Sequence, residues 1–152
     1  MNPFNARLTL TLGALALSVA AGSAQAASLL ALGSDGQLFK IDSSSLKVTG
    51  KMAAQSPVAL RGFDIRPVNG QLYALGSDNQ LYTLDLASGA AKVAAKLNTS
   101  LPGAGQAVVD FNPVADRLRL LGPDGTSLRV NVETGEVAVD GKVAYAADGP
   151  YA

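Results

Sequence analysis

The chain has 152 residues with no Cys, no His and no Trp, and its twelve basic side chains balance twelve acidic ones. The absence of Cys excludes disulfide frameworks and thiolate metal sites, and the absence of His excludes serine hydrolysis with a histidine base. The balanced charge argues against nucleic acid as a partner, because a surface that neutralises phosphates needs a surplus of Lys and Arg.

The first 26 residues have the layout of a secretory signal peptide. A short start with one basic side chain, Arg7, precedes an apolar run over 8–21, and residues 24–26 form a small-x-small cleavage site. An uncleaved anchor is the alternative, but the apolar run is too short to span a bilayer comfortably. We therefore expect cleavage after Ala26, a periplasmic or extracellular protein, and no membrane attachment afterwards. The mature part, 27–152, is expected to form one β-repeat domain.

The mature chain repeats itself at a period typical of β-propeller blades. Residues 29–42 lie over 72–85 at an offset of 43 without a gap, and a third copy begins at Leu118 with one residue inserted. Repeats of this length that are rich in strands and punctuated by Gly are characteristic of propellers. The sequence predicts an all-β fold: a partial β-propeller of about three four-stranded antiparallel blades.

The second copy shows the strands of one blade most clearly. Apolar and polar residues alternate over 80–85, which is the period of two expected of a half-buried strand, and the Asn69-Gly70 pair is a hairpin signal. The first copy lacks a first strand, because the signal peptide occupies that place. Residues 142–146 predict a lone first strand at the other end. Within the second copy we expect strands over 62–66, 71–76, 80–86 and 90–97, and no helix after the signal peptide.

Three blades are too few for a closed ring, since propellers have about four to eight. The chain is therefore expected to be an open partial ring, a fragment of a longer propeller, or a subunit that completes its ring with other chains, and a fragment or truncated homologue is favoured. Open sheet edges would favour self-association, and a six-bladed ring built from two chains is one form that it could take.

Two similar motifs then point to a known family. They are Phe63-Asp64-Ile65-Arg66-Pro67 and Val109-Asp110-Phe111-Asn112-Pro113, and the later Thr134-Gly135 and Val139-Asp140-Gly141 fit the same pattern. In these motifs the chain resembles the bacterial secreted proteins grouped as domain of unknown function 4394, over nearly all of its mature part. The resemblance implies a propeller-like fold and export, and it assigns a catalytic role to no residue. Members of the family generally continue with further repeats.

Asp64 and Asp110 occupy equivalent positions, each shortly before a turn that a proline opens. One interpretation is a ring of carboxylates that binds a cation such as calcium. The other is structural, with each carboxylate accepting hydrogen bonds from nearby backbone N–H groups. Because the two Asp recur in successive units, the structural interpretation is favoured. No cofactor is expected, and calcium is the one candidate.

The arginines are the second group of candidate residues. Arg66, which Asn112 replaces in the next unit, could bind an anionic ligand through its guanidinium fork, or pair with Asp64 or Asp110. Arg117, Arg119 and Arg129 could form a surface that binds small anions. The alternative for these three is a solvated sheet face with scattered counter-ions.

The repeat alignment also predicts which residues face each other across one hairpin. It places Leu30 opposite Phe39, Tyr73 opposite Tyr82, and Arg119 opposite Arg129 in the three copies. Two arginines directly opposite each other repel unless an acid or an anion lies between them, and Glu133 or Asp116 could supply that acid.

Three functions remain open. The first is a non-catalytic binding or interaction module. The second is a carboxylate- or cation-dependent hydrolase or lyase of a sugar or lactone that uses Asp64 and Asp110, since paired carboxylates suffice for glycoside hydrolysis. The third is an inactive fragment of a longer propeller. Because the chain has no His and its acids recur with the repeat, the first is favoured over an enzyme.

Overall fold

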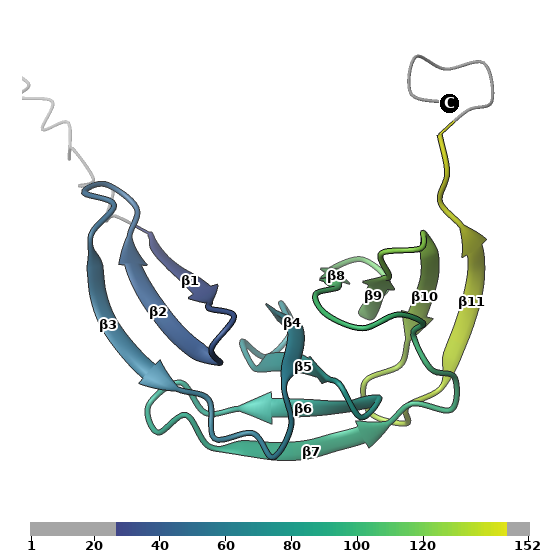
Figure 1. The fold of residues 1–152 in the computed structure, drawn as a ribbon, viewed down its shortest axis with the longest axis horizontal. Helices are drawn as coiled ribbons and strands as arrows, with labels where there is room; N and C mark the ends of the chain where they lie inside the picture. The colour runs from purple at the N-terminus through teal and green to yellow at the C-terminus, as the bar shows by residue number, and fades with distance from the viewer. Residues whose placement is uncertain (1–26, 146–152) are drawn as a thin grey trace, which may run out of the picture.

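The structure, a computed structural model, describes residues 27–145, and these form eleven β-strands in three antiparallel sheets without a helix. The sheets stand side by side along an arc that is open on one side (Figure 1). We call them the first, second and third blade. The predicted signal peptide and the last residues, 146–152, lie outside the described part of the chain.

Each blade is a meander of consecutive strands. The first blade has only three: β1 (Ser28–Leu32), β2 (Gln37–Asp42) and β3 (Val48–Ala53). The second blade has the predicted four: β4 (Leu60–Ile65), β5 (Leu72–Gly76), β6 (Gln80–Leu84) and β7 (Ala91–Lys96). The third also has four: β8 (Val108–Asn112), β9 (Arg117–Leu121), β10 (Thr126–Val130) and β11 (Val137–Lys142). The innermost strands β4 and β8 are neighbours, and β3, β7 and β11 form the convex rim (Figure 1).

The third blade repeats the second at an offset of 46 residues without the predicted insertion. Tyr73 pairs with Thr83, and Arg119 pairs with Arg129. The prediction that the two arginines face each other is therefore confirmed, but the predicted pairing of Tyr73 with Tyr82 is wrong, as is the pairing of Leu30 with Phe39. Tyr82 faces Ala74, and Leu30 faces Lys40. In the structure the hairpin of the second blade is centred on Asp78, so Tyr73 lies opposite Thr83. In the third blade the residue equivalent to Leu81 is the buried Ser127 and not Leu128.

The predicted lone strand over 142–146 is also corrected. Lys142 is the last residue of β11, and 143–145 form no strand. At the offset of 46, residues 143–145 correspond to Leu97, Asn98 and Thr99, which follow the outermost strand of the second blade. They therefore continue from the rim and do not begin a new blade.

Opposite faces of the second blade contact its two neighbours. We call the side of a blade that points to the next blade in sequence its forward face, and the other side its backward face. Because side chains alternate along a strand, Tyr73 and Leu75 lie on the forward face of β5, and Leu72 and Ala74 lie on its backward face. All four are buried, as is the whole of β5.

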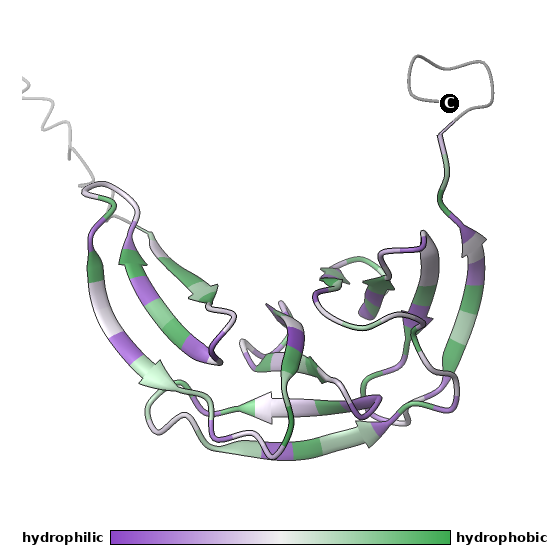
Figure 2. Ribbon diagram, in the orientation of Figure 1, coloured by the Kyte–Doolittle hydropathy of each residue, from purple (hydrophilic) through white to green (hydrophobic). Residues whose placement is uncertain are grey.

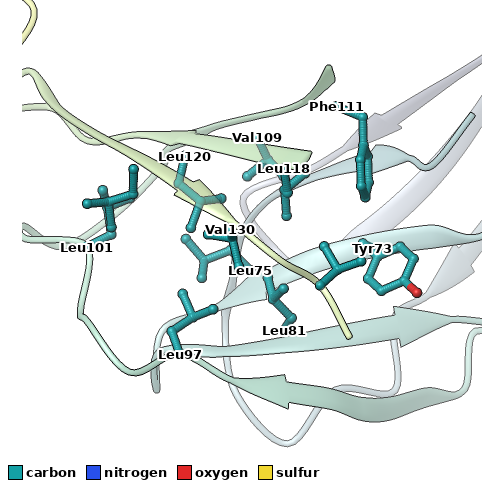
Figure 3. Close-up of a cluster of buried hydrophobic side chains, with 12 residues drawn as sticks. Tyr73, Leu75, Leu81, Leu97, Leu101, Val109, Phe111, Leu118, Leu120 and Val130 are labelled. Carbon is teal, nitrogen blue, oxygen red and sulfur yellow. The ribbon is translucent and has the colours of Figure 1, made fainter. Parts of the chain in front are cut away.

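Two hydrophobic clusters fill the seams between blades. The seam between the second and third blades holds twelve buried residues, among them Leu75, Leu118 and Leu120, which are fully buried (Figure 3). Here the rings of Tyr73 and Phe111 meet edge to face, with their centroids 5.6 Å apart. The seam between the first and second blades has four buried residues and is otherwise packed by half-buried side chains.

The two ends of the arc carry different side chains. On β1 and β2 the backward face of the first blade is apolar, with Leu29, Ala31, Phe39 and Ile41, and Leu29 is 48% exposed. Lys51 of β3 lies on the same face, with its Nζ 5.3 Å from the centroid of the Phe39 ring. The forward face of the third blade is polar, with Arg117, Arg119, Arg129 and Asn131. Figure 2 shows β1 as an apolar strand, whereas β9 alternates between hydrophilic and apolar residues. Residues 27–145 include no helix that is long and apolar enough to cross a membrane.

Candidate functional site

Arg66 connects the second blade to the third. Its Nε donates a hydrogen bond to Asp116 Oδ1 at 2.9 Å, and its Nη2 donates to Asp116 and, at 3.0 Å, to Glu133. Both acids lie in turns of the third blade, and the Arg66 side chain is only 10% exposed. The expected partners of Arg66 were Asp64 or Asp110. The structure instead pairs it with the two acids that the sequence analysis had assigned to the other arginines.

This ion pair shifts the titration of both groups and depends on an unusual backbone. The hydrogen bonds from Arg66 hold the pKa of Asp116 below its ordinary value, and the Asp116 carboxylate raises the pKa of Arg66 against the effect of burial. Asp116 has a φ of 47°, where the equivalent turn of the second blade has Gly70 at 69°. A residue with a side chain is strained in this left-handed region. The third blade therefore has a strained residue, Asp116, in this turn, and the side chain of that residue places a carboxylate beside Arg66.

Arg119 and Arg129 share an acid that the sequence analysis did not identify. Arg129 Nε donates to both carboxylate oxygens of Asp140, at 2.7 and 2.8 Å, and Arg119 Nη2 lies 3.4 Å from the same carboxylate. Arg119 Nη1 also donates to the hydroxyl of Ser127 at 2.9 Å. The repulsion expected between facing arginines is thus offset by one carboxylate between them.

A β-bulge places Asp140 there. The register between β10 and β11 shifts so that Ser127 pairs with Gly141 and Leu128 with Val139, which leaves Asp140 without a partner. An extra residue in one strand re-aims its side chain. The second blade has the same bulge with Ala94 in this position. A comparison of the two blades in sequence could have identified this ion pair. Three polar residues of the third blade, Arg119, Arg129 and Asp140, together replace Tyr73, Thr83 and Ala94 of the second.

Arg117 lies at the start of β9 and contacts only its own turn. Its Nη1 donates to the carbonyl oxygens of Ala115 and Asp116, at 3.4 and 3.0 Å. Beside it lies a hollow of about 290 Å³ that is also lined by Arg129, Asn131 and Glu136. The Nη1 and Nη2 groups of Arg129 donate no hydrogen bond within the described residues. The structure therefore brings three of the four predicted arginines onto one surface and places Arg66 on the other side of the third blade.

The two candidate carboxylates have different surroundings. Asp64 accepts hydrogen bonds from the backbone N–H of Ile65 at 2.8 Å and, across the seam, from the N–H of Phe111 at 2.7 Å. Asp110 is exposed and faces Arg119 across the ladder, but its carboxylate has no hydrogen bond within 27–145. Asp64 therefore matches the structural interpretation. Among the described residues, no group of three or more acids lies close enough together to hold a metal ion.

Arg61 is a buried residue that the sequence analysis missed. It is 8% exposed, and its guanidinium donates to three backbone carbonyl oxygens in the connection to the third blade: Gly105 at 2.9 Å, Leu101 at 3.0 Å and Pro102 at 3.2 Å. Carbonyl oxygens of a loop leave no sequence pattern, so nothing in the sequence marks these partners. Arg61, Asp64 and Arg66 all come from β4 or its end, and all three bind forward to the third blade.

A further hollow in the arc lies beside the first blade. Its volume is about 560 Å³, and it is lined by β1 and the residues after it, by the start of β4, and by β8 with the residues before it. This is the inner side of the arc, where the first blade lacks the strand that β4 and β8 provide in the other two (Figure 1).

Comparisons with known proteins give a family and no activity. A family model described as "Domain of unknown function (DUF4394)" matches residues 37–152. Among solved structures, the chain is similar to BamB from Moraxella catarrhalis, with a TM-score of 0.40 and 17% sequence identity. That match covers 76% of this chain and 34% of the BamB chain, so this chain spans about a third of that protein's length. No curated protein matches.

Proposed function

Because the chain belongs to the family described as Domain of unknown function (DUF4394), we propose its function from the geometry: it is an exported, non-catalytic interaction module that acts through the first-blade end of its arc. Export rests on the sequence of the first 26 residues, with cleavage after Ala26. The mass of the protein recovered outside the cytoplasm tests this. A product that begins at Ala27 supports it, and a product that retains Met1 contradicts it.

One observation carries the proposed function: within residues 27–145 no other blade packs against the backward face of the first blade, where β1 and β2 present apolar side chains and Lys51 Nζ of β3 lies 5.3 Å from the centroid of the Phe39 ring. The apolar residues of this face correspond at the offset of 43 to Leu72, Ala74, Tyr82 and Leu84, all of which are buried in the second blade. In the first blade Leu29 is 48% exposed, and Ala31, Phe39 and Ile41 are half-buried. A sheet face with the side chains of an interior position, but without a neighbour, is typical of an interaction surface.

The surroundings of the carboxylates favour binding over hydrolysis. An acid–base pair needs two carboxylates that are free to exchange protons with a substrate. Asp64 is held by two backbone N–H groups, one of them from the neighbouring blade. Of the two candidate carboxylates, only that of Asp110 accepts no hydrogen bond within 27–145, and this favours the binding module over the hydrolase alternative.

The arc is not complementary to itself from end to end. A six-bladed ring of two chains would press the forward face of the third blade onto the backward face of the first. That contact would bury the charges of Arg119, Arg129 and Asp140 against Leu29 and Ile41, and charges that leave water without new partners cost several kcal/mol each. We therefore expect two chains to associate through their apolar first blades.

Sedimentation equilibrium tests this surface without knowledge of a natural partner. We expect the apparent mass to rise from that of a monomer with concentration. Leu29→Lys should hold the protein as a monomer, because it places a charge on the apolar face. Val114→Lys is the matched control, since Val114 is 96% exposed in a turn away from that face, and it should associate like the wild type. A wild-type monomer at all concentrations, or equal effects of the two variants, would contradict the proposal.

A second candidate function is the binding of small anions by Arg117, Arg119 and Arg129. The observation in its favour is that the terminal nitrogens of Arg129, which donate no hydrogen bond to any residue of 27–145, lie beside a hollow that Arg117 also lines. Calorimetry with tripolyphosphate tests it. Arg129→Gln should weaken binding about tenfold, and Lys92→Gln, which removes the same charge from the second blade, should not. Equal weakening by both variants would show attraction to net charge alone.

A further inference from the structure

The first blade has a strand edge that the other blades cover. In the second and third blades the innermost strands, β4 and β8, pair with β5 and β9. β1 is the equivalent of β5 and β9, but within the described residues it pairs with β2 alone. Its other edge borders the hollow of about 560 Å³.

The hydrogen bonds beyond the two ends of β1 show which backbone groups face this edge. Ser43 N–H donates to the carbonyl of Ala27 at 3.0 Å, and Gly33 N–H donates to the carbonyl of Gln37 at 2.8 Å. The odd-numbered residues therefore bond to β2, because hydrogen-bonded positions alternate along an antiparallel strand. The N–H and C=O groups that face the open edge belong to the even-numbered residues: Ser28, Leu30 and Leu32.

The equivalent groups of the second blade are paired with β4. At the offset of 43, Leu30 corresponds to Tyr73 and Leu32 to Leu75. Tyr73 lies opposite Asp64, and Leu75 lies opposite Gly62. The open edge of β1 thus presents the same alternation of donors and acceptors that holds β4 in the second blade. A strand added there would occupy, relative to the second blade, the position that β4 occupies relative to the third.

The contact between β4 and β8 defines the sequence that such a strand needs. A Cβ added to Gly62 would lie 2.5 Å from the carbonyl oxygen of Ala107, so this position accepts only glycine. Asp64 reaches forward to the N–H of Phe111, and the residue equivalent to Phe111 in the second blade is Ile65. An aspartate in the added strand would therefore lie next to the N–H of Ile65, which already donates to Asp64 Oδ1 at 2.8 Å, so the two carboxylates would share this donor.

The remaining positions require apolar side chains. Phe63 packs in the seam between the first and second blades, and Val109 and Phe111 of β8 are buried in the next seam. In an added strand the equivalent side chains would join the uncovered apolar face of Leu29 and Ile41. The required pattern is glycine, apolar, aspartate, apolar.

We propose that the open edge of β1 binds an extended segment of another polypeptide as a fourth strand, and that this segment carries the pattern Gly-apolar-Asp-apolar. The inference rests on the proposed interaction function and names its partner. Addition of a strand to an exposed sheet edge is an established mode of peptide recognition, in which the backbone gives affinity and alternate side chains give specificity. The partner is an unpaired strand and not a second folded copy, because β4 and β8 of a folded copy are already paired.

A labelled peptide with the sequence of Leu60–Pro67 is the probe, and the protein is purified from cells that express the full chain. We expect saturable binding by fluorescence anisotropy. Changing the glycine of the peptide to valine should weaken binding at least tenfold, because its side chain would meet the backbone of β4. Changing the aspartate to alanine should weaken it about fivefold, since one hydrogen bond to a charged group is lost. A scrambled peptide should not bind.

Two variants of the protein locate the binding. Leu30→Pro removes an N–H from the open edge and should weaken binding at least tenfold. The variant should still fold, because proline is tolerated on an edge strand. Leu30→Ala keeps that N–H and controls for the loss of the side chain, so it should bind within about threefold of the wild type. Circular dichroism establishes that both variants fold, and the peptide variants test the same contacts on the unaltered protein.

The outcomes separate this inference from the proposed function. Equal binding to Leu30→Pro and Leu30→Ala would overturn the site at β1, as would insensitivity to the glycine-to-valine change. If the peptide does not bind but Leu29→Lys still abolishes association of the protein, the strand site is wrong and the interaction module stands. If neither effect is seen, both proposals fail.

Discussion

The seam between the first and second blades differs from the seam between the second and third, although the blades repeat one sequence pattern. Both seams share an outer contact: Gln55 N–H donates to the carbonyl of Gly89 at 2.8 Å, and Asn98 N–H donates to that of Gly135 at 3.1 Å. On the inner side of the arc, the hydrogen bonds and ion pairs that side chains make between blades within 27–145 are those of Arg61, Asp64 and Arg66 across the second seam, and all three residues come from β4 or its end. The innermost strand of a blade therefore seals the seam to the next blade, and the first blade has no such strand.

Substitutions in the hydrophobic clusters should show the difference between the two seams most strongly. Leu75 and Leu32 are equivalent residues, but Leu75 is fully buried and Leu32 is half-buried. Leu75→Ala is expected to lower the free energy of unfolding by about 2–5 kcal/mol, because it leaves a cavity. Leu32→Ala should cost roughly half as much or less. Chemical denaturation of both variants measures this, and equal losses would show that the two seams are sealed alike.

The next largest effect on stability is expected at Arg66. Arg66→Gln removes the ion pairs to Asp116 and Glu133, and we expect the Tm at pH 7 to fall by roughly 3–6 °C. Because Arg66 holds the pKa of Asp116 below its ordinary value of 3.8, the stabilisation is present above that pH and is lost as pH falls below it. The difference in Tm between wild type and variant should therefore shrink at pH 3. An unchanged difference would mean that Arg66 acts through packing alone.

Asp64 and Asp110 occupy equivalent positions, so a comparison of their variants tests the contact that Asp64 makes with the third blade. Asp64→Ala leaves the N–H of Phe111 without its partner and is expected to cost about 1–2 kcal/mol of stability. Asp110→Ala should change stability by no more than about 0.5 kcal/mol, because its carboxylate is exposed and unbonded. Thermal unfolding of the two variants gives the comparison. Equal effects would contradict the structural role of Asp64.

The smallest expected effect is at Tyr82, whose equivalent in the first blade is Phe39. The Tyr82 hydroxyl donates to Asp78 at 2.6 Å, and this bond, together with burial, raises the pKa of Tyr82 to about 12. Tyr82→Phe should cost about 1 kcal/mol. The raised pKa also means that this stabilisation is complete below pH 10 and is lost as pH rises towards 12. Absorbance at 295 nm should show one late-titrating tyrosine that is missing from the variant.

The repeat itself allowed the blades and their strands to be predicted, and the facing arginines were predicted correctly although the same alignment misplaced the pairing of Tyr73 by one residue. Local turn chemistry and the alternation of apolar residues carry that information over short distances. The partners of the charged residues could not be predicted, because they depend on contacts between blades. Arg66 and Glu133 are 67 residues apart, and nothing near either one indicates the other. Asp140 was hidden for another reason: its position follows from a bulge, which shifts the register by one residue.

The contacts of Arg61, Asp64 and Arg66 all join the second blade to the third, and this determines which part of the protein opens first. The second and third blades should behave as one cooperative unit, since β4 contributes to both, whereas the first blade is joined to them by a sparser core and the outer contact. In native-state hydrogen exchange, amides of β2 should therefore exchange through openings of lower free energy than amides of β6. Occupation of the edge of β1 by an added strand would merge the two units into one.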